Sequence, residues 1–348
     1  IDIESLSMHT FITGSTGTGK STTIYSILDK LMSHKIKGQN ENISFLVVEP
    51  SKGEYKDRFG GYPDVKVYGT NYKKMQLLKI NPFSFPEDIH VLEHIDRLIE
   101  IFNVCWPMYA AMPAVLKDAV ERAYIVSGWN LETSESRYKD SSGNPLFPSF
   151  IDVLNQINVV IEESAYSSDS KGDYKGALCT RLRSLTNGLY GQIFSNDELS
   201  SDELFDSNVI VDLSRVGSSE TKSLIMGLLV MKLQEHRMAN TRYGNSPLKH
   251  ITVLEEAHNI LKRTPTEQSA ESANLLGKSV EMLANSIAEM RTYGEGFIIA
   301  DQAPGLLDMA VIRNTNTKII MRLPDQTDRE LVGKSANLTL QKLGIKTI

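Results

Sequence analysis

The sequence of 348 residues lacks the features of several protein classes. It has two cysteines, Cys105 and Cys179, whose spacing fits neither a disulfide framework nor a metal-ligand motif, so a reducing, cytoplasmic location is expected. No apolar run approaches the roughly 20 residues needed to span a bilayer, and no signal peptide opens the chain, so we expect no stable membrane insertion. A composition with 41% hydrophobic and 23% charged residues also excludes long disorder and collagen-like repeats.

The chain lacks an excess of basic residues as well. It has 37 Lys and Arg against 43 Asp and Glu, and this net charge of −6 argues against a uniformly basic surface that coats nucleic acid. A local basic channel stays compatible with the balance, because the total charge does not report where the charges lie.

The chain does contain an alternation of short apolar runs and longer amphipathic stretches. The apolar runs are nearly continuous in β-branched or large residues, as strands buried on both faces should be. They are His9–Thr13, Phe45–Val48, Val209–Leu213, Ile251–Leu254, Phe297–Ala300 and Lys318–Met321. Helical patterns cover Lys20–His34, Ser219–Arg237 and Ala270–Tyr293. The alternation predicts an α/β fold with a mostly parallel central sheet and helices on both faces.

The stretch 84–205 has a different pattern, with no convincing strand. Apolar residues recur at three- and four-residue spacing in Ile89–Phe102, and Pro113 suits the first turn of a further helix. We therefore predict a helical insertion over 84–205, which divides an α/β core into the parts 1–83 and 206–348.

Local signals refine this helical stretch. Two pairs fit capping boxes, Ser84 with Glu87 and Ser149 with Asp152, the second at the start of a helix over Phe150–Glu163. Two polar stretches are expected to be surface connections between helices, Thr133–Asn144 and Ser164–Gly176.

Residues 14–21, with the sequence Gly-Ser-Thr-Gly-Thr-Gly-Lys-Ser, match the phosphate-binding pattern G-x-x-x-x-G-K-[ST] between a predicted strand and a predicted helix. The glycines let several backbone N–H groups converge on a phosphate chain, and the positive end of the next helix adds to the attraction. Lys20 is expected to reach the β- and γ-phosphates, and the Ser21 hydroxyl to ligate Mg²⁺. The predicted nucleotide-binding residues are Gly14, Ser15, Thr16, Gly17, Thr18, Gly19, Lys20, Ser21 and Thr22.

Two acids follow the apolar run Ile251–Leu254. Glu255 is placed to bind Mg²⁺ through its water shell, and Glu256 to orient or deprotonate the attacking water. Two acids at a strand end are by themselves more often solvated than catalytic, but the upstream phosphate loop favours the catalytic interpretation.

Two further side chains are candidates for catalysis. Gln302 could sense the γ-phosphate or hold the water, or it could merely bond the turn before Pro304. Arg291 could offset the dipole of the helix that it ends, or reach a neighbouring subunit's nucleotide as an arginine finger. The spacing leaves the role of Arg291 open.

Weaker candidates lie near these motifs. The loop from Glu49 to Tyr55 could serve the site with a lysine and two acids, although a solvated loop is the default interpretation. His9 and His258 flank the motifs, and lone histidines are more often structural than catalytic. The segment Lys262–Lys278 could face a pore, with a solvated loop at least as plausible.

Five segments occur in the order of the HerA–FtsK superfamily of ring ATPases and are most similar to its HerA-like branch: HTFITGSTGTGKST, VVEPSKGEY, ITVLEEAHNIL, AEMRTYGEGFIIADQAP and IRNTNTKIIMRLPDQTDRE. The resemblance implies a RecA-like P-loop NTPase that uses ATP and Mg²⁺. It implies Lys20 and Ser21 as phosphate and Mg²⁺ ligands, Glu256 as the catalytic glutamate, Gln302 as the polar sensor and Arg291 as an arginine acting in trans. The sequence departs from the family in having Glu255 where Asp is commoner and Met290 where Gly is usual.

The resemblance also carries expectations about function. It implies a homohexameric ring that translocates DNA and works with a nuclease or another effector, in DNA end processing or antiphage defence. It places the N-terminal β-barrel of HerA proteins upstream of Ile1. The segment INPF at residues 80–83 is similar to conjugation and type IV secretion ATPases, which keeps such a motor as an alternative. A nucleotide-stabilised scaffold for an effector is a further one.

Overall fold

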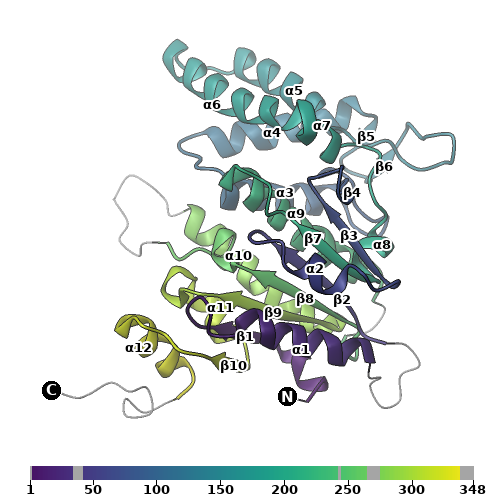
Figure 1. The fold of residues 1–348 in the computed structure, drawn as a ribbon. Coiled ribbons are helices and arrows are strands. Elements are labelled where there is room, and N and C mark those ends of the chain that lie inside the picture. Colours follow the sequence, from purple (N-terminus) through teal and green to yellow (C-terminus); the bar gives the residue numbers. More distant parts are fainter. Residues whose placement is uncertain (1, 34–41, 242–243, 265–274, 338–348) are drawn as a thin grey trace.

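The computed structural model describes residues 2–33, 42–241, 244–264 and 275–337. A parallel eight-stranded sheet forms its centre, in the order β10-β1-β9-β8-β2-β7-β3-β4 (Figure 1). The strands are β1 Thr10–Thr13, β2 Ser44–Glu49, β3 Val65–Gly69, β4 Gln76–Leu77, β7 Asn208–Asp212, β8 His250–Glu255, β9 Glu295–Asp301 and β10 Thr317–Ile320. Each predicted apolar run forms one of these strands, so the predicted parallel sheet is confirmed.

The two strands at one edge of the sheet, β3 and β4, were not predicted. In β3 the exposed Lys66 interrupts the apolar run, and β4 has two residues. Edge strands of this kind are buried less evenly than central ones, and their sequences therefore lack the continuous apolar pattern.

Successive side chains of the central strands enter two separate cores. On β9, Phe297 and Ile299 belong to one core, while Ile298 and Ala300 belong to the other. Helices α3 (Val91–Cys105), α9 (Ser219–Ala239) and α10 (Leu275–Glu289) contribute to the first, and α1 (Lys20–Ser33) and α2 (Tyr55–Phe59) to the second. The predicted cover of helices on both faces is confirmed.

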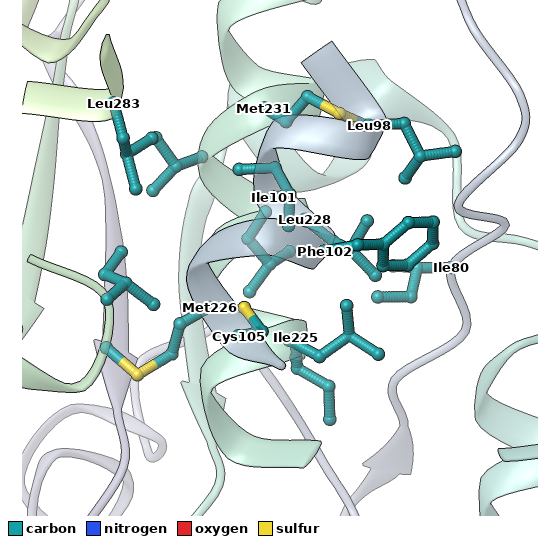
Figure 2. Close-up of a cluster of buried hydrophobic side chains, with 14 of the residues drawn as sticks. Ile80, Leu98, Ile101, Phe102, Cys105, Ile225, Met226, Leu228, Met231 and Leu283 are labelled. Carbon is teal, nitrogen blue, oxygen red and sulfur yellow. The ribbon is translucent and has the colours of Figure 1, made fainter. Parts of the chain in front are cut away.

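Helix α3 packs closely against α9 in the first core. Figure 2 shows Leu98, Ile101, Phe102 and Cys105 of α3 beside Ile225, Met226, Leu228 and Met231 of α9, with Leu283 of α10 at the side. Gly227 lies in this contact, and a Cβ there would come within 2.9 Å of the Ile101 Cγ2 atom. The missing side chain of Gly227 thus allows the two helices to approach.

Between β4 and β7 the chain forms helices and one short hairpin. After α3 come α4 (Met112–Val126), the hairpin of β5 (Trp129–Asn130) and β6 (Glu135–Ser136), α5 (Phe150–Glu163), α6 (Ser168–Thr186), α7 (Gly188–Ile193) and α8 (Ser201–Phe205). Helices α4, α5 and α6 pack against one another in chain order, and Figure 1 shows them above the sheet. The hairpin corrects the expectation of a stretch without strands.

The local signals in this stretch gave mixed results. Pro113 lies in the first turn of α4, and Ser149 with Asp152 forms the predicted capping box of α5. The capping box of Ser84 and Glu87 is wrong, because α3 begins at Val91 and its backbone is capped by the His90 ring. The Ser84 hydroxyl instead accepts a hydrogen bond from the buried Lys232 ammonium at 2.6 Å.

The predicted surface loop over Ser164–Gly176 is also wrong in its second half. Helix α6 begins at Ser168, with the hydroxyl of Ser167 accepting from the backbone N–H of Ser170. Its polar first turns concealed a buried face that begins at Tyr174 and continues through Leu178 and Leu182.

The remaining elements complete the core around the sheet. They are the helices α11 (Met309–Asn314) and α12 (Gln326–Ser335) and the 3-10 turns η1 (Glu4–Met8), η2 (Ala257–Asn259), η3 (Met290–Tyr293) and η4 (Pro304–Leu306). Cys105 and Cys179 are both buried and free. Among the helices described, none combines the length and the apolar character that crossing a membrane requires.

Candidate active site

The phosphate loop leaves β1 at the carboxyl edge of the sheet, between the ends of β9 and β10. Gly17 and Gly19 have φ of 78° and 103°, which side chains rarely adopt, and no atom lies within 4 Å of where their Cβ atoms would be. The loop therefore presents an open backbone surface. Its start is tied to β10, because Ser15 donates to the Arg322 carbonyl from its backbone N–H at 3.0 Å and from its hydroxyl at 3.2 Å.

Lys20 begins α1 and folds back across the loop. Its Nζ donates to the carbonyl oxygens of Gly14 at 2.6 Å and Ser15 at 3.3 Å. Burial lowers the pKa of Lys20, and the neighbouring carboxylates of Glu255 and Glu256 oppose that effect. The ammonium thus lies between the phosphate loop and the two acids at the end of β8.

Glu255 is the last residue of β8 and is 9% exposed. Its Oε1 accepts a hydrogen bond of 2.6 Å from the hydroxyl of Tyr55, the first residue of α2. Burial raises the pKa of Glu255, while the Tyr55 hydrogen bond and the charge of Lys20 hold it down. Tyr55 ends the loop that was a weaker candidate for the site, but nothing in the loop pattern indicated that this tyrosine would reach β8.

Glu256 and Gln302 link β8 and β9 to the phosphate loop. Glu256 has a left-handed backbone with φ of 47°, which is strained for a residue with a side chain. Gln302 donates from Nε2 to Glu256 Oε2 at 3.3 Å, and its Oε1 accepts from the Thr16 hydroxyl at 3.0 Å. The structure thus brings Thr16, Lys20, Glu255, Glu256 and Gln302 to one place, and their roles remain predictions.

The loop after β2 is built more firmly than the default interpretation of a solvated loop. The buried Glu49 carboxylate accepts from the backbone N–H groups of Glu54 at 2.8 Å and Tyr55 at 3.2 Å. Burial raises the pKa of Glu49 to about 7, against the effect of these hydrogen bonds. Lys56 forms an ion pair of 2.6 Å with Asp212 at the end of β7, which fixes the loop from the other side.

The two histidines near the motifs have different surroundings. His9 is buried at the amino end of β1, where its Nδ1 accepts from the backbone N–H of Phe297, so it is structural. His258 lies in the site, with Nδ1 at 2.8 Å from Asp301 Oδ2 and 3.6 Å from Glu256 Oε2. Neither His258 nor Asp301 was predicted as a functional residue, since their meeting depends on the pairing of β8 with β9.

Arg291 lies far from the phosphate loop of its own chain. It is exposed in η3, which precedes the amino end of β9, whereas the loop lies at the carboxyl edge. The seven residues of β9 span about 20 Å at the usual rise per residue. An arginine side chain cannot cover that distance, so any role at a nucleotide requires another subunit.

The predicted pore-facing segment is only partly described. Lys262 and Arg263 are exposed after β8, and the Arg263 backbone N–H donates to the Leu306 carbonyl at 2.7 Å. Lys278 is exposed on α10, and residues 265–274 lie outside the described residues. The pore assignment stays a prediction.

The residues of the site fit a nucleotide triphosphate with Mg²⁺. The open backbone at Gly17 and Gly19 and the first turn of α1 would hold the phosphates, together with Lys20. Ser21, in that turn, and Glu255, through water, would hold the Mg²⁺ ion. When bound, the ion supplies positive charge to the phosphate oxygens.

The chain is similar in sequence to a family of helicases. Residues 1–233 match the family described as "Helicase HerA, central domain". The chain is 21% identical to the DNA double-strand break repair helicase HerA of Pyrococcus furiosus, in an alignment that covers 96% of the chain and 59% of that protein. It spans about three fifths of the length of the curated relatives that it matches.

Solved structures show the same fold. VirB4 of Thermoanaerobacter pseudethanolicus superimposes with a TM-score of 0.66 at 16% identity, covering 97% of this chain and 82% of that chain. The bacterial conjugative coupling protein TrwB without its first 70 residues gives 0.53 at 10% identity, covering 96% and 68%. The predicted RecA-like α/β fold of a P-loop NTPase is confirmed.

Proposed function

We propose, since this chain belongs to the family of the helicase HerA central domain, that it hydrolyses ATP to drive translocation along DNA. The observation that carries the proposal is the connection from Thr16 through Gln302 to Glu256. These hydrogen bonds join the phosphate loop to the predicted catalytic carboxylate across two strand ends. If the turns after β1, β8 and β9 had only structural roles, hydrogen bonds between their side chains would not be required.

The residues divide the reaction among them. Lys20 moves from the Gly14 and Ser15 carbonyls to the phosphate oxygens, where its charge stabilises the transition state. Glu256 accepts a proton from the attacking water, and Gln302 holds that water in line. The strained backbone of Glu256 keeps its carboxylate aimed at this position.

Assembly into a homohexamer is part of the proposal. The exposed Arg291 lies at the opposite end of the sheet from its own phosphate loop, which suits an arginine that completes a neighbour's site. Hydrolysis then depends on a closed ring, in which each subunit presents Arg291 to the next. The relatives named HerA support DNA as the substrate of this motor.

Two finer points are also proposals. We expect a nuclease or another effector to use the motor in DNA end processing or antiphage defence, in the cytoplasm. We also retain residues 84–205 as an insertion in a core formed by 1–83 and 206–348. The chain leaves the sheet after β4 and returns to it at β7, which supports this division.

Two variants test the hydrolytic site. Lys20→Ala is expected to abolish ATP hydrolysis, measured as phosphate release, while circular dichroism and thermal unfolding stay as in the wild type. Glu256→Gln keeps the shape of the side chain and should bind a fluorescent ATP analogue normally, yet retain it without turnover. A Lys20→Ala variant with wild-type turnover would refute the site.

The DNA-dependent part needs a separate measurement. Addition of linear duplex or single-stranded DNA should raise the ATPase rate of the assembled wild type, and the Lys20→Ala variant serves as the blank. Slow hydrolysis that is indifferent to both kinds of DNA would favour the nucleotide-stabilised scaffold over the motor.

A further inference from the structure

The carboxylate of Asp301 is fixed in the wall of the proposed active site. Asp301 ends β9 beside Thr13, the last residue before the phosphate loop, and it is fully buried. Its Oδ1 accepts from the backbone N–H of Ala303 at 3.0 Å. Its Oδ2 accepts from the backbone N–H of His258 at 3.0 Å and from the His258 ring at 2.8 Å.

These contacts define the state of the His258 ring. A carboxylate only accepts hydrogen bonds, so the Nδ1 atom that faces Asp301 carries a proton. The hydrogen bond to Asp301 raises the pKa of His258, which favours the doubly protonated, cationic ring. Asp301 thus fixes the orientation of the ring.

The ring of His258 faces the predicted catalytic carboxylate. Its Nδ1 lies 3.6 Å from Glu256 Oε2, the same oxygen that accepts from Gln302 Nε2 at 3.3 Å. In the part of the chain that the structure describes, Glu256 Oε1 has no hydrogen-bond partner. The two neighbours therefore engage one oxygen of Glu256 and leave the other for water.

The backbone of Glu256 needs such support. Its left-handed conformation, with φ of 47°, is unfavourable for a residue with a Cβ. Asn259 fixes the carbonyl of Glu256 with hydrogen bonds from its backbone N–H at 3.0 Å and from Nδ2 at 2.7 Å. Asn259 holds the main chain but does not contact the carboxylate, whose Oε2 accepts from Gln302 and lies beside the His258 ring.

We propose that Asp301 and His258 form a positioning pair that orients the Glu256 carboxylate toward the attacking water. The proposal rests on the proposed ATPase function and assigns roles to two residues to which the motifs themselves gave none. His258 acts through Glu256 and does not touch the nucleotide. Asp301 acts through His258, so loss of either partner removes the same effect.

A metal site is the competing explanation of this cluster. Ligand atoms of Glu256, His258 and Asp301 lie within 4.8 Å of one another. However, two N–H donors of His258 already point at Asp301 Oδ2, and a carboxylate oxygen has two lone pairs. A cation there would have to displace both hydrogen bonds, so the cluster is better suited to holding a proton.

A matched pair of variants tests the positioning role. His258→Asn places an amide N–H near the position of Nδ1 and keeps a donor to Asp301, whereas His258→Leu has a similar shape without any donor. His258→Leu and Asp301→Asn should each lower kcat of ATP hydrolysis about 10- to 100-fold, as loss of an outer orienting partner does in metal sites. KM and the affinity for a fluorescent ATP analogue should change less than about twofold, and His258→Asn should recover most of kcat.

A double variant shows whether His258 acts through Glu256. In single-turnover experiments, Glu256→Gln with His258→Leu should be no slower than Glu256→Gln alone, since the carboxylate to be oriented is already gone. Additive losses would overturn the proposal. So would a dependence of the rate on Zn²⁺ or a chelator of Zn²⁺, which would support the metal site. Should His258→Leu fail to fold, the smaller His258→Ala replaces it at this partly exposed position.

Failure of the two proposals can be told apart. A wild-type ring without ATPase activity, or a fully active Lys20→Ala variant, contradicts the proposed function itself. The positioning pair alone is overturned by a different result. In that case the wild type is active and Lys20→Ala is inactive, but the rate of His258→Leu lies within about twofold of wild type.

Discussion

The two ends of the parallel sheet both carry many charged side chains, but the charges are satisfied in different ways. At the amino end, the buried Glu295 accepts from Arg237 Nε at 2.9 Å, His250 Nδ1 at 2.8 Å and the Thr252 hydroxyl at 2.8 Å. Arg237 also forms an ion pair of 2.5 Å with Asp206. At the carboxyl end, Lys20 bonds to backbone carbonyls and Glu256 has a strained backbone.

This difference between the two ends distinguishes charged side chains that stabilise the fold from those that serve the active site. Although burial opposes it, Arg237 and the hydrogen bond from His250 hold the pKa of Glu295 below its usual value, so this carboxylate stays ionised. Burial lowers the pKa of His250, which favours its neutral ring. At the carboxyl end, Lys20 bonds only to backbone carbonyls and Glu256 combines a strained backbone with one engaged carboxylate oxygen, as expected where a ligand completes the site. Removing a charge at either end tests this contrast.

The largest expected effect belongs to Arg291, an exposed cation at the amino end. If a neighbouring nucleotide is its partner, Arg291→Ala should bind ATP and assemble, yet hydrolyse about 10³-fold more slowly, as loss of an arginine finger does elsewhere. Steady-state phosphate release measures the rate, and Arg313→Ala serves as the control because Arg313 is also exposed, at the end of α11.

Mixed rings distinguish the two possible roles of Arg291. Arg291→Ala subunits keep the phosphate loop and Lys20→Ala subunits keep the arginine, so mixtures should recover activity where intact halves meet. Activity that stays at baseline at every mixing ratio, after subunit exchange is confirmed, contradicts action in trans. A fully active Arg291→Ala variant would instead support a role in offsetting the helix dipole.

The next effect concerns stability at the amino end. Glu295→Gln removes the charge that faces the buried Arg237, and breaking such a buried pair should lower the free energy of unfolding by about 3 kcal/mol. Denaturant unfolding measures this loss. Lys20→Ala at the other end should change it by less than about 1 kcal/mol. Equal losses of unfolding free energy in the two variants would contradict the difference between the two ends of the sheet.

Glu49 gives a smaller effect with a defined pH dependence. Burial raises its pKa from 4.5 to about 7 in the folded chain. Between these pH values the unfolded chain has released a proton that the folded chain retains, so stability decreases as the pH rises. The loss should reach at most about 3 kcal/mol. Glu49→Gln should remove this decrease in stability with pH. Unfolding experiments between pH 4.5 and 8 without nucleotide measure it. If the free energy of unfolding of the variant still falls with pH as in the wild type, other groups cause the pH dependence.

The smallest effect is expected for the exposed cations after β8. If Lys262 and Arg263 contact DNA phosphates, their double alanine variant should need severalfold more DNA for half-maximal ATPase stimulation. The salt dependence of DNA binding should also become shallower, by a slope of about 0.9 for each lost contact. Identical stimulation curves for variant and wild type would leave both residues as part of a solvated loop.

The central strands and the phosphate loop could be predicted because their signals are local. An apolar run such as Ile251–Leu254 indicates a strand, and a glycine pattern such as that of residues 14–21 indicates a phosphate loop, without information from distant residues. The start of α3 could not be derived in this way, since it depends on the His90 ring and not on a capping box. The polar first turns of α6 likewise hid a helix that is stabilised by its buried face.

The candidate site shows the same division. The positions of Lys20, Glu255 and Glu256 followed from motifs, whereas the contacts of Tyr55, His258 and Asp301 required β2, β8 and β9 to be placed side by side. Their contacts join residues 43 and 200 positions apart in the sequence. No local pattern carries information about contacts of such separation.

The position of β1 has a consequence for the order in which the protein can be made. Strand β1 pairs with β9 and β10, whose residues lie roughly 300 positions later in the chain. During synthesis, the phosphate loop cannot be fastened until the Arg322 carbonyl that receives Ser15, 307 positions later, has left the ribosome. The nascent chain therefore carries its nucleotide motif without a nucleotide pocket while that stretch is made, and the late closure of such distant contacts makes folding slow.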